Sequence, residues 1–249
     1  MNFLTRLNFI PQHVAEAALS IICAADPEGS AANFLPHKLV LQLLALQVRL
    51  CIPWRCMPCK STLLARRRRW IELGIFDRLM KSMLVEADEV SFVDCTFIEC
   101  KEPHPDRGWT KIGNGLKIMV ICRDDGKIIA IKVACASKAE AKLLQDLLAE
   151  KPWLAIQWLV GDSAYDTPDN RSGCAARGMH MITTNNWPNR KESLDVPEER
   201  AAAKHERWIV EHVNAWLKNW RGVATCYCRS AATYFANLTF AVAAVNGRA

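Results

Sequence analysis

The sequence predicts an α/β fold, in which a mixed sheet carries helices on both faces and follows a small all-α region. Two observations predict this fold. Apolar residues recur at helical spacing through residues 1–86 and are interrupted by prolines. After residue 87, short runs rich in Ile and Val alternate with amphipathic stretches and turn residues. We therefore expect a helical, basic N-terminal region at 1–86 and an α/β domain at 87–249.

The bulk composition predicts a globular protein with a sizeable core. Of the 249 residues, 51% are hydrophobic, and the formal net charge is +6. This mildly basic balance is compatible with nucleic acid as a partner. The many cysteines and the lack of a long apolar stretch at the start favour reduced thiols in the cytoplasm. The apolar stretches 39–48 and 234–245 are too short to span a bilayer, which needs ~20 residues, so we expect no membrane association.

The N-terminal region contains a basic helix. A helix is predicted at 37–50, and a pair of helices at 61–84 is separated by Gly74. The first helix of this pair carries four consecutive arginines: Arg66, Arg67, Arg68 and Arg69. Solvation alone accounts for a shorter run, so a phosphate-contacting surface explains the cluster better. Cys56 and Cys59 form a Cys-x-x-Cys pair nearby, but no second pair follows at the spacing of a zinc site.

The region after residue 87 is predicted to alternate between strands and helices. In chain order, the elements are strands at 89–98, 116–122 and 127–136, a helix at 137–150, a strand at 156–160, a helix at 167–178, a strand at 179–183 and a helix at 204–221. The glycine-rich loop at 99–115 is either a phosphate contact or a plain surface loop. This order is the layout of a ribonuclease-H-like fold, in which the first and fourth strands lie side by side.

Three carboxylates are candidate metal ligands. Asp94 and Asp162 each follow a run of apolar strand residues, and the predicted fold makes them neighbours. Glu211 lies on the predicted C-terminal helix. Asp166 and Glu99 also lie near these strands and remain alternatives. Oxygen ligands suit Mg²⁺, with Mn²⁺ as a substitute, and three converging carboxylates repel one another unless a cation is bound.

The helix predicted at 204–221 is amphipathic. At ~100° per residue, Arg207, Glu211 and Lys218 fall within roughly 40° of one another on the helical wheel. The plain alternative is a solvated helix face with salt-bridge spacing. The two strand aspartates reduce the weight of that alternative, because they supply further ligands for a cation.

These residues resemble the DDE transposases of bacterial insertion sequences, in the broad group that includes insertion sequences four and five. The C-terminal signature of that group is Tyr, two residues, Arg, three residues, Glu, six residues, Lys. Arg207, Glu211 and Lys218 keep this spacing, and Lys204 stands at the tyrosine position. The resemblance covers residues 52–245. Further matching runs lie at 93–96, 161–166 and 229–234.

The resemblance implies a transposase that acts on double-stranded DNA, both element terminal repeats and target, as a homodimer. The region 1–86 is then a DNA-binding region, and 87–249 is a ribonuclease-H-like DDE catalytic domain. Asp94, Asp162 and Glu211 are then the catalytic metal ligands. Water attacks at an element end, and the freed 3′-hydroxyl attacks a target phosphodiester. Three cations contact the DNA: Lys204, Arg207 and Lys218. The replacement of tyrosine by Lys204 alters one DNA contact and leaves the metal ligands in place.

Two other functions remain open at this stage. One is a catalytically degenerate, transposase-derived DNA-binding protein that acts as a regulator. The other is a structure-selective nuclease on the same fold. Metal-dependent strand cleavage separates the regulator from both enzymes, and joining of a donor end to a target separates the transposase from the nuclease.

Overall fold

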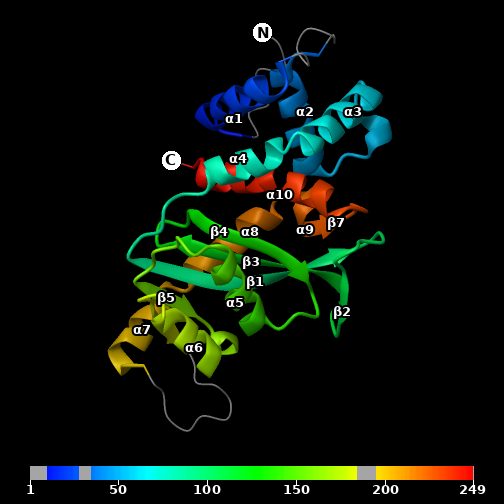
Figure 1. Ribbon diagram of the computed structural model, residues 1–249. Helices are drawn as coiled ribbons and strands as arrows, with labels where there is room; N and C mark the ends of the chain where they lie inside the picture. Colours follow the sequence, from blue (N-terminus) through cyan, green and yellow to red (C-terminus); the bar gives the residue numbers. More distant parts are fainter. Residues whose placement is uncertain (1–9, 28–34, 184–194, 249) are drawn as a thin grey trace. The chain divides into compact units, whose positions relative to one another are not determined.

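A computed structural model describes residues 10–27, 35–183 and 195–248 (Figure 1). Two compact units divide the chain. The helical unit lies within Met1–Leu84, Cys100–Pro105 and Trp216–Ala249, and the sheet unit lies within Val85–Glu99 and Asp106–Ala215. Each unit is therefore assembled from segments that are distant in the sequence. Whether 1–86 and 87–249 act as separate functional regions stays a prediction.

The sheet unit is built on a mixed sheet. Its strands are β1 (Val90–Cys100), β2 (Gly108–Thr110), β3 (Gly113–Arg123), β4 (Ile128–Cys135), β5 (Trp158–Gly161) and β6 (His180–Thr183). β3 pairs antiparallel with β1, β2 and β4, whereas β5 pairs parallel with β1 and β6. The order β4-β3-β1-β5-β6 places the first and fourth predicted strands side by side, as the ribonuclease-H-like layout requires. The predicted fold class is confirmed.

The predicted hairpin at residues 116–136 is confirmed as β3 and β4. Their turn closes with a hydrogen bond of 3.1 Å from the Gly126 N–H to the Arg123 carbonyl. Gly126 has φ of 78°, a conformation that a residue with a side chain rarely adopts. The Asp125 carboxylate accepts a hydrogen bond of 3.0 Å from the Lys127 N–H and fixes the turn further.

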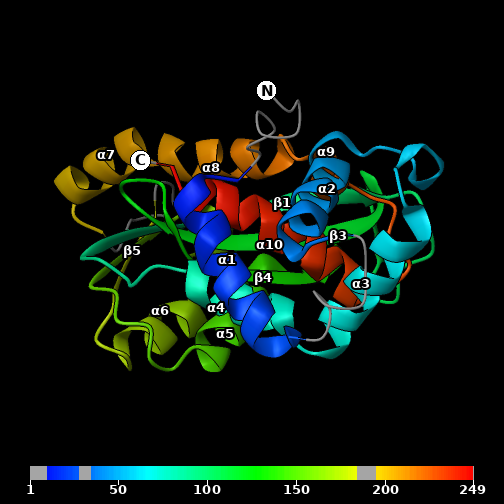
Figure 2. The ribbon, with the colours of Figure 1, turned by 90° about the horizontal axis from the view of Figure 1, so that it is seen from above.

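Helices cover both faces of this sheet. They are α5 (Glu140–Glu150), α6 (Pro168–Ala175), α7 (Pro197–Glu206) and the first turns of α8 (Trp208–Lys218). Figure 2 shows α5 and α6 on one face and α7 and α8 on the other. Because side chains alternate along a strand, Val93 faces the α5 side of the sheet, and its neighbour Asp94 faces α8.

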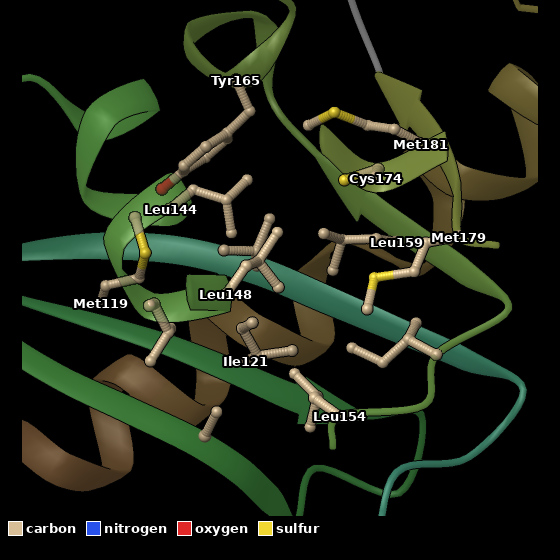
Figure 3. Close-up of a cluster of buried hydrophobic side chains, with 14 of the residues drawn as sticks. Met119, Ile121, Leu144, Leu148, Leu154, Leu159, Tyr165, Cys174, Met179 and Met181 are labelled. Carbon is tan, nitrogen blue, oxygen red and sulfur yellow. The ribbon is translucent and has the colours of Figure 1, made fainter. Parts of the chain in front are cut away.

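The core between the sheet and α5 is built from buried, mostly apolar side chains (Figure 3). Leu143, Leu144, Leu147 and Leu148 recur at the spacing of one helix face and are buried. They pack against a set of side chains from the strands and from α6, which includes Met119, Ile121, Leu159, Cys174 and Met181. This face therefore anchors β1 and β5, the two strands that carry the candidate aspartates.

The prediction of one long helix at 204–221 is wrong. Helical structure divides at Arg207, between α7 and α8, and again where Trp220 takes an extended conformation before the short helix α9 (Arg221–Ala224). Trp220 is buried, and its φ of −87° and ψ of 100° lie outside the helical range. Tertiary packing of this side chain outweighs the helical pattern of the sequence.

The helical unit contains elements from both ends of the chain. They are α1 (Gln12–Ala25), α2 (His37–Leu50), the 3₁₀ helix η3 (Trp54–Cys56), α3 (Lys60–Glu72), α4 (Ile75–Met83), α9, the two-residue strand β7 (Thr225–Cys226) and α10 (Ala231–Asn246). α10 packs against α2, α3, α4 and α9, and apolar residues all around it are buried. The helix predicted at 37–50 is confirmed. Within the described ranges, no helix is both long and apolar enough to cross a membrane.

A buried ion-pair network joins Arg171 on α6 and Thr183 on β6 to two aspartates, Asp166 before α6 and Asp195 two residues before α7. Arg171 donates to both oxygens of Asp195, at 2.8 and 3.0 Å, and to Asp166 at 2.6 Å. Thr183 adds backbone and side-chain hydrogen bonds of 3.0 Å to Asp195. Burial raises the pKa of Asp195, but the hydrogen bonds from Arg171 and Thr183 outweigh it, so the pKa is lowered.

Replacing Arg171 with Met is expected to lower the free energy of unfolding by about 3–5 kcal/mol at pH 7, because two buried carboxylates lose their cation. Since the folded-state pKa of Asp195 is depressed, its contribution is present above the unfolded pKa of about 3.9 and is lost as pH falls below it. Urea unfolding from pH 7 to 3 measures both effects. The exposed Arg177→Met variant is the control. Equal stability of the two variants at pH 7 would contradict the proposed role of the network.

Candidate active site

Strand register brings Asp94 and Asp162 together. In the parallel pairing of β1 with β5, Phe92 lies opposite Val160. Asp94 and Asp162 each stand two residues further along their strands, and therefore at the same level of the sheet. Asp94 lies within β1, and Asp162 directly follows β5 as the N-cap residue of the 3₁₀ helix η4 (Ser163–Tyr165). The predicted proximity of these two aspartates is thus present in the fold.

One oxygen of each aspartate is fixed by a hydrogen bond from the protein. Asn214 Nδ2, on α8, donates to Asp94 Oδ2 at 2.9 Å. The Ala164 N–H donates to Asp162 Oδ1 at 2.8 Å, which is the N-cap bond of η4. Both carboxylates are consequently oriented by neighbours, and each keeps a second oxygen for another interaction.

The second oxygens face the same guanidinium group. Arg207 Nη2 lies 3.7 Å from Asp94 Oδ1 and 3.5 Å from Asp162 Oδ2. These distances exceed those of strong hydrogen bonds, so the contacts are ion pairs with loose geometry. Arg207 Nε and Asn214 Oδ1 are also buried and have no hydrogen-bond partner in the described part of the chain. The guanidinium of Arg207 therefore lies between two carboxylates, and two polar atoms beside it lack a hydrogen-bond partner among the described residues.

Burial raises the pKa of Asp94 to about 6. The charge of Arg207 and a backbone hydrogen bond from Cys95 oppose this effect, and the negative charge of Asp162 adds to it. The ionised form of Asp94 is therefore costly in this position. A divalent cation would relieve that cost by offsetting both negative charges.

Glu211 is exposed on α8, one turn before Asn214. In residues 10–27, 35–183 and 195–248, no three Cys, His, Asp or Glu side chains are arranged to hold a metal ion. The two aspartates fit a divalent cation in their chemistry, since two carboxylate oxygens already face one positive group. Glu211 lies near the pair along the helix but does not complete a three-carboxylate cluster in this structure.

The predicted DNA-binding arginines on α3 have different environments. Arg66 is buried, with Nη1 at 2.9 Å from His37 Nδ1 and 3.8 Å from Asp26 Oδ2. Arg69 is half-exposed and donates from Nε to Asp26 Oδ1 at 2.8 Å. Burial raises the pKa of Asp26, but the hydrogen bond and charge of Arg69 outweigh it and lower the pKa. Arg66 and Arg69 thus hold α3 to the end of α1.

The remaining arginines of this run are more accessible. The Arg67 guanidinium lies over the Trp54 ring, 4.6 Å from its centroid, and the Arg68 side chain is exposed. Of the other predicted contacts, Lys204 is exposed on α7 and Lys218 is half-buried at the end of α8. Arg207 is the predicted DNA contact that the structure places beside the aspartates.

Sequence reasoning missed Asn214. The signal was available, because Asn214 follows Glu211 by three residues and Arg207 by seven, which places it on the same helical stripe. The loop at 99–115 contains β2 and part of β3, and it exposes Trp109 and Ile112.

Replacing Asp94 with Asn is expected to stabilise the metal-free protein at pH 8. The gap between a pKa of about 6 and the ordinary 3.8 corresponds to roughly 3 kcal/mol as an upper bound. The pKa of Asp94 is higher in the folded state than in the unfolded state. The free energy of unfolding of the wild type therefore falls as pH rises through about 6, whereas that of the variant, which has no carboxyl at this position, does not. Urea unfolding in EDTA at pH 8 and pH 4 measures the difference in free energy of unfolding between the variant and the wild type. This difference should be smaller at pH 4.

The matched control for this measurement is Asp124→Asn, which neutralises an exposed carboxylate at the β3–β4 turn. A pH-independent effect of Asp94→Asn, or an equal gain from Asp124→Asn, would contradict the assignment of a costly charge to Asp94.

Comparisons with solved structures return weak structural similarities. The catalytic core domain of BIV integrase is 16% identical, with a TM-score of 0.37 over 62% of this chain and 80% of that chain. A piggyBac transposase synaptic complex with hairpin DNA is 10% identical, with a TM-score of 0.47 over 94% of this chain and 64% of that chain. A simian T-cell lymphotropic virus intasome is 12% identical, with a TM-score of 0.35 over 53% of this chain and 39% of that chain.

The sequence itself matches a known family. No curated protein matches the chain. The family model described as "Transposase DDE domain" matches residues 86–246, which is more than half of the chain and includes Asp94, Asp162 and Glu211. The chain belongs to the family of proteins with a transposase DDE domain.

Proposed function

We propose that this protein is a DNA transposase that cleaves the ends of an insertion sequence and joins them to target DNA. One observation carries the proposal: Asp94 and Asp162, from separate strands, present oxygens to a single nitrogen of Arg207. Membership of the transposase DDE family supports it. The subgroup that contains insertion sequences four and five remains part of the proposal, on the spacing of Arg207, Glu211 and Lys218.

Asp94 and Asp162 would hold a divalent cation, Mg²⁺ with Mn²⁺ as a substitute, and Glu211 would be the third carboxylate ligand. When bound, such cations stabilise the charge that develops on the phosphorus oxygens and on the attacking and leaving oxygens. Glu211 lies on α8 one turn from Asn214, which already contacts Asp94. A change of side-chain rotamer, or a shift of the first turn of α8, would bring this carboxylate toward the pair.

Three groups of the protein prepare the aspartates for this role. Asn214 fixes one oxygen of Asp94, and the Ala164 N–H fixes one oxygen of Asp162. Arg207 neutralises the remaining oxygens and limits their repulsion while no metal is bound. A bound cation would supply that positive charge, and the guanidinium of Arg207 would then be available to contact a phosphate of the DNA backbone.

The contacts to double-stranded DNA would come from exposed cations. Arg68 and Lys204 have exposed side chains, Arg69 is half-exposed, and Arg67 is partly buried over Trp54. Lys218 completes the family spacing. Arg66 is buried in an ion pair with Asp26, so a role in DNA binding for Arg66 would be indirect, through the position of α3. A homodimer that brings two element ends together is part of the proposal.

Replacing Glu211 with Gln is expected to reduce DNA cleavage by about 100-fold or more, because a metal ligand is lost while the side chain keeps its size. The assay uses donor DNA that carries the terminal repeats flanking the gene, with Mg²⁺ or Mn²⁺ and with EDTA. The control is Glu206→Gln, which removes an exposed carboxylate from the end of α7 and should cleave as the wild type does.

The outcomes separate the candidate functions. Cleavage that requires metal and Glu211, followed by a joined product, supports the transposase. Cleavage without joining contradicts it in favour of a nuclease. Binding of the repeats without cleavage by the wild type contradicts the catalytic proposal and leaves a DNA-binding regulator derived from a transposase.

A further inference from the structure

A cavity of about 890 Å³ lies within the helical unit, and no residue of the candidate active site lines it. Its walls come from the end of α2, the loop around η3, α3, the segment at 221–230 and the start of α10. This volume lies within the range of pockets that hold small molecules. Of the predicted site residues, Arg67 lines it.

The lining of the cavity is positively charged. Arg67, Arg221 and Arg229 all line it, and no Asp or Glu belongs to the lining. Arg221 forms no ion pair within the described chain, whereas Arg229 is highly exposed and donates to Glu102 at 2.8 Å. Burial lowers the pKa of Arg67, and the neighbouring Cys228 opposes this effect. A concave surface with this charge attracts a phosphate group.

Aromatic and polar groups accompany the arginines. Trp54 lies under Arg67, and Tyr227 is 54% exposed at the cavity wall. Nucleobases stack on such side chains, at about 1–3 kcal/mol per base. Asn237 lines the cavity and is only 5% exposed, and its Oδ1 has no hydrogen-bond partner among the described residues. The exocyclic amino group of a base could satisfy this acceptor.

The N-terminus of α10 also contributes. Ser230 and Thr233 line the cavity, and the Ser230 hydroxyl accepts a hydrogen bond of 3.2 Å from the Thr233 N–H. The positive end of this 16-residue helix therefore points to the same region as the arginines. This contribution adds to a site that the three arginines and the two aromatic side chains already define.

We infer that this cavity binds one unstacked nucleotide of a DNA strand, with its phosphate near Arg67, Arg221 and Arg229 and its base against Trp54 or Tyr227. The inference rests on the proposed action on DNA. It does not depend on the cleavage chemistry, because no residue of the candidate metal site lines the cavity.

The first test is binding of a fluorescent single-stranded trideoxynucleotide by the full chain in EDTA, measured by anisotropy. Arg221→Gln and Tyr227→Ala change exposed cavity residues and should each weaken binding about tenfold. Arg55→Gln is the matched control, because Arg55 is exposed and follows Trp54 but does not line the cavity. It should change the affinity by less than about twofold. Equal losses in Arg221→Gln and Arg55→Gln would overturn the inference.

The second test uses thiols as reporters. Cys228 lines the cavity, whereas Cys56 is exposed outside it. The interaction with the Cys226 thiol and the charge of Arg67 lower the pKa of Cys228, although burial opposes them, so this thiol should react readily with iodoacetamide. The trideoxynucleotide should slow alkylation of Cys228 several-fold and leave Cys56 unaffected, as read by mass spectrometry. Unchanged Cys228 alkylation at saturating trideoxynucleotide would overturn the inference.

Two further ligands, inorganic phosphate and a free deoxynucleoside monophosphate, show which part of the DNA strand the cavity recognises. Inorganic phosphate that protects Cys228 as strongly as the trideoxynucleotide would reduce the cavity to an anion site and overturn the role of the base. A free deoxynucleoside monophosphate that binds as tightly would overturn the assignment to a DNA strand. The Glu211→Gln variant should bind and protect as the wild type does. Loss of DNA cleavage with normal trideoxynucleotide binding would count against the proposed catalysis alone, and loss of trideoxynucleotide binding would count against the cavity.

Discussion

The placement of two partly buried carboxylates, Asp94 and Asp162, side by side is the constraint on which the polar groups of the candidate site depend. Parallel pairing of β1 with β5 puts the two carboxylates at one level of the sheet. Burial makes the ionised form of Asp94 costly, and the negative charge of Asp162 adds to that cost. Asn214, the Ala164 N–H and Arg207 together stabilise the two carboxylates. An apolar core on the opposite face of the sheet holds the strands in this register.

The polar groups on the stripe of α7 and α8 that faces the sheet differ in their contacts. Arg207 contacts both aspartates and Asn214 contacts Asp94, while Glu211, which lies between them in the sequence, is exposed. Arg207 keeps helical dihedral angles, with φ of −59° and ψ of −23°, so the interruption of the helix leaves these residues on one stripe. The structure therefore places the guanidinium of Arg207, and not the carboxylate of Glu211, between the strand carboxylates.

Much of the sheet unit was predictable from the sequence. Asp94 and Asp162 end apolar runs in an order of elements that makes their strands neighbours, and the β3–β4 hairpin has a clear turn signal at Gly126. These predictions rest on short-range patterns and on a topology with few alternatives. The division at Arg207 was not predictable, because local helical propensity extends through it.

The helical unit shows where sequence patterns are insufficient. The arginine run suggested one phosphate-contacting surface, yet Arg66 is buried against Asp26, a residue forty positions away that no local pattern identifies as its partner. The position of α10 is equally hidden, since a helix that is apolar on all sides gives no direction for its packing. The arginine-lined cavity brings Arg67 together with Arg221 and Arg229, so it depends on the fold and not on any motif.

The most direct measurement is Mn²⁺ binding by electron paramagnetic resonance. The account predicts that the wild type binds Mn²⁺ and that Asp94→Asn and Asp162→Asn each reduce the affinity at least about tenfold. It also predicts that Arg207→Gln binds at least as tightly as the wild type, because the competing cation is gone. Unchanged Mn²⁺ binding in both aspartate variants would contradict the claim that this carboxylate pair is a metal site.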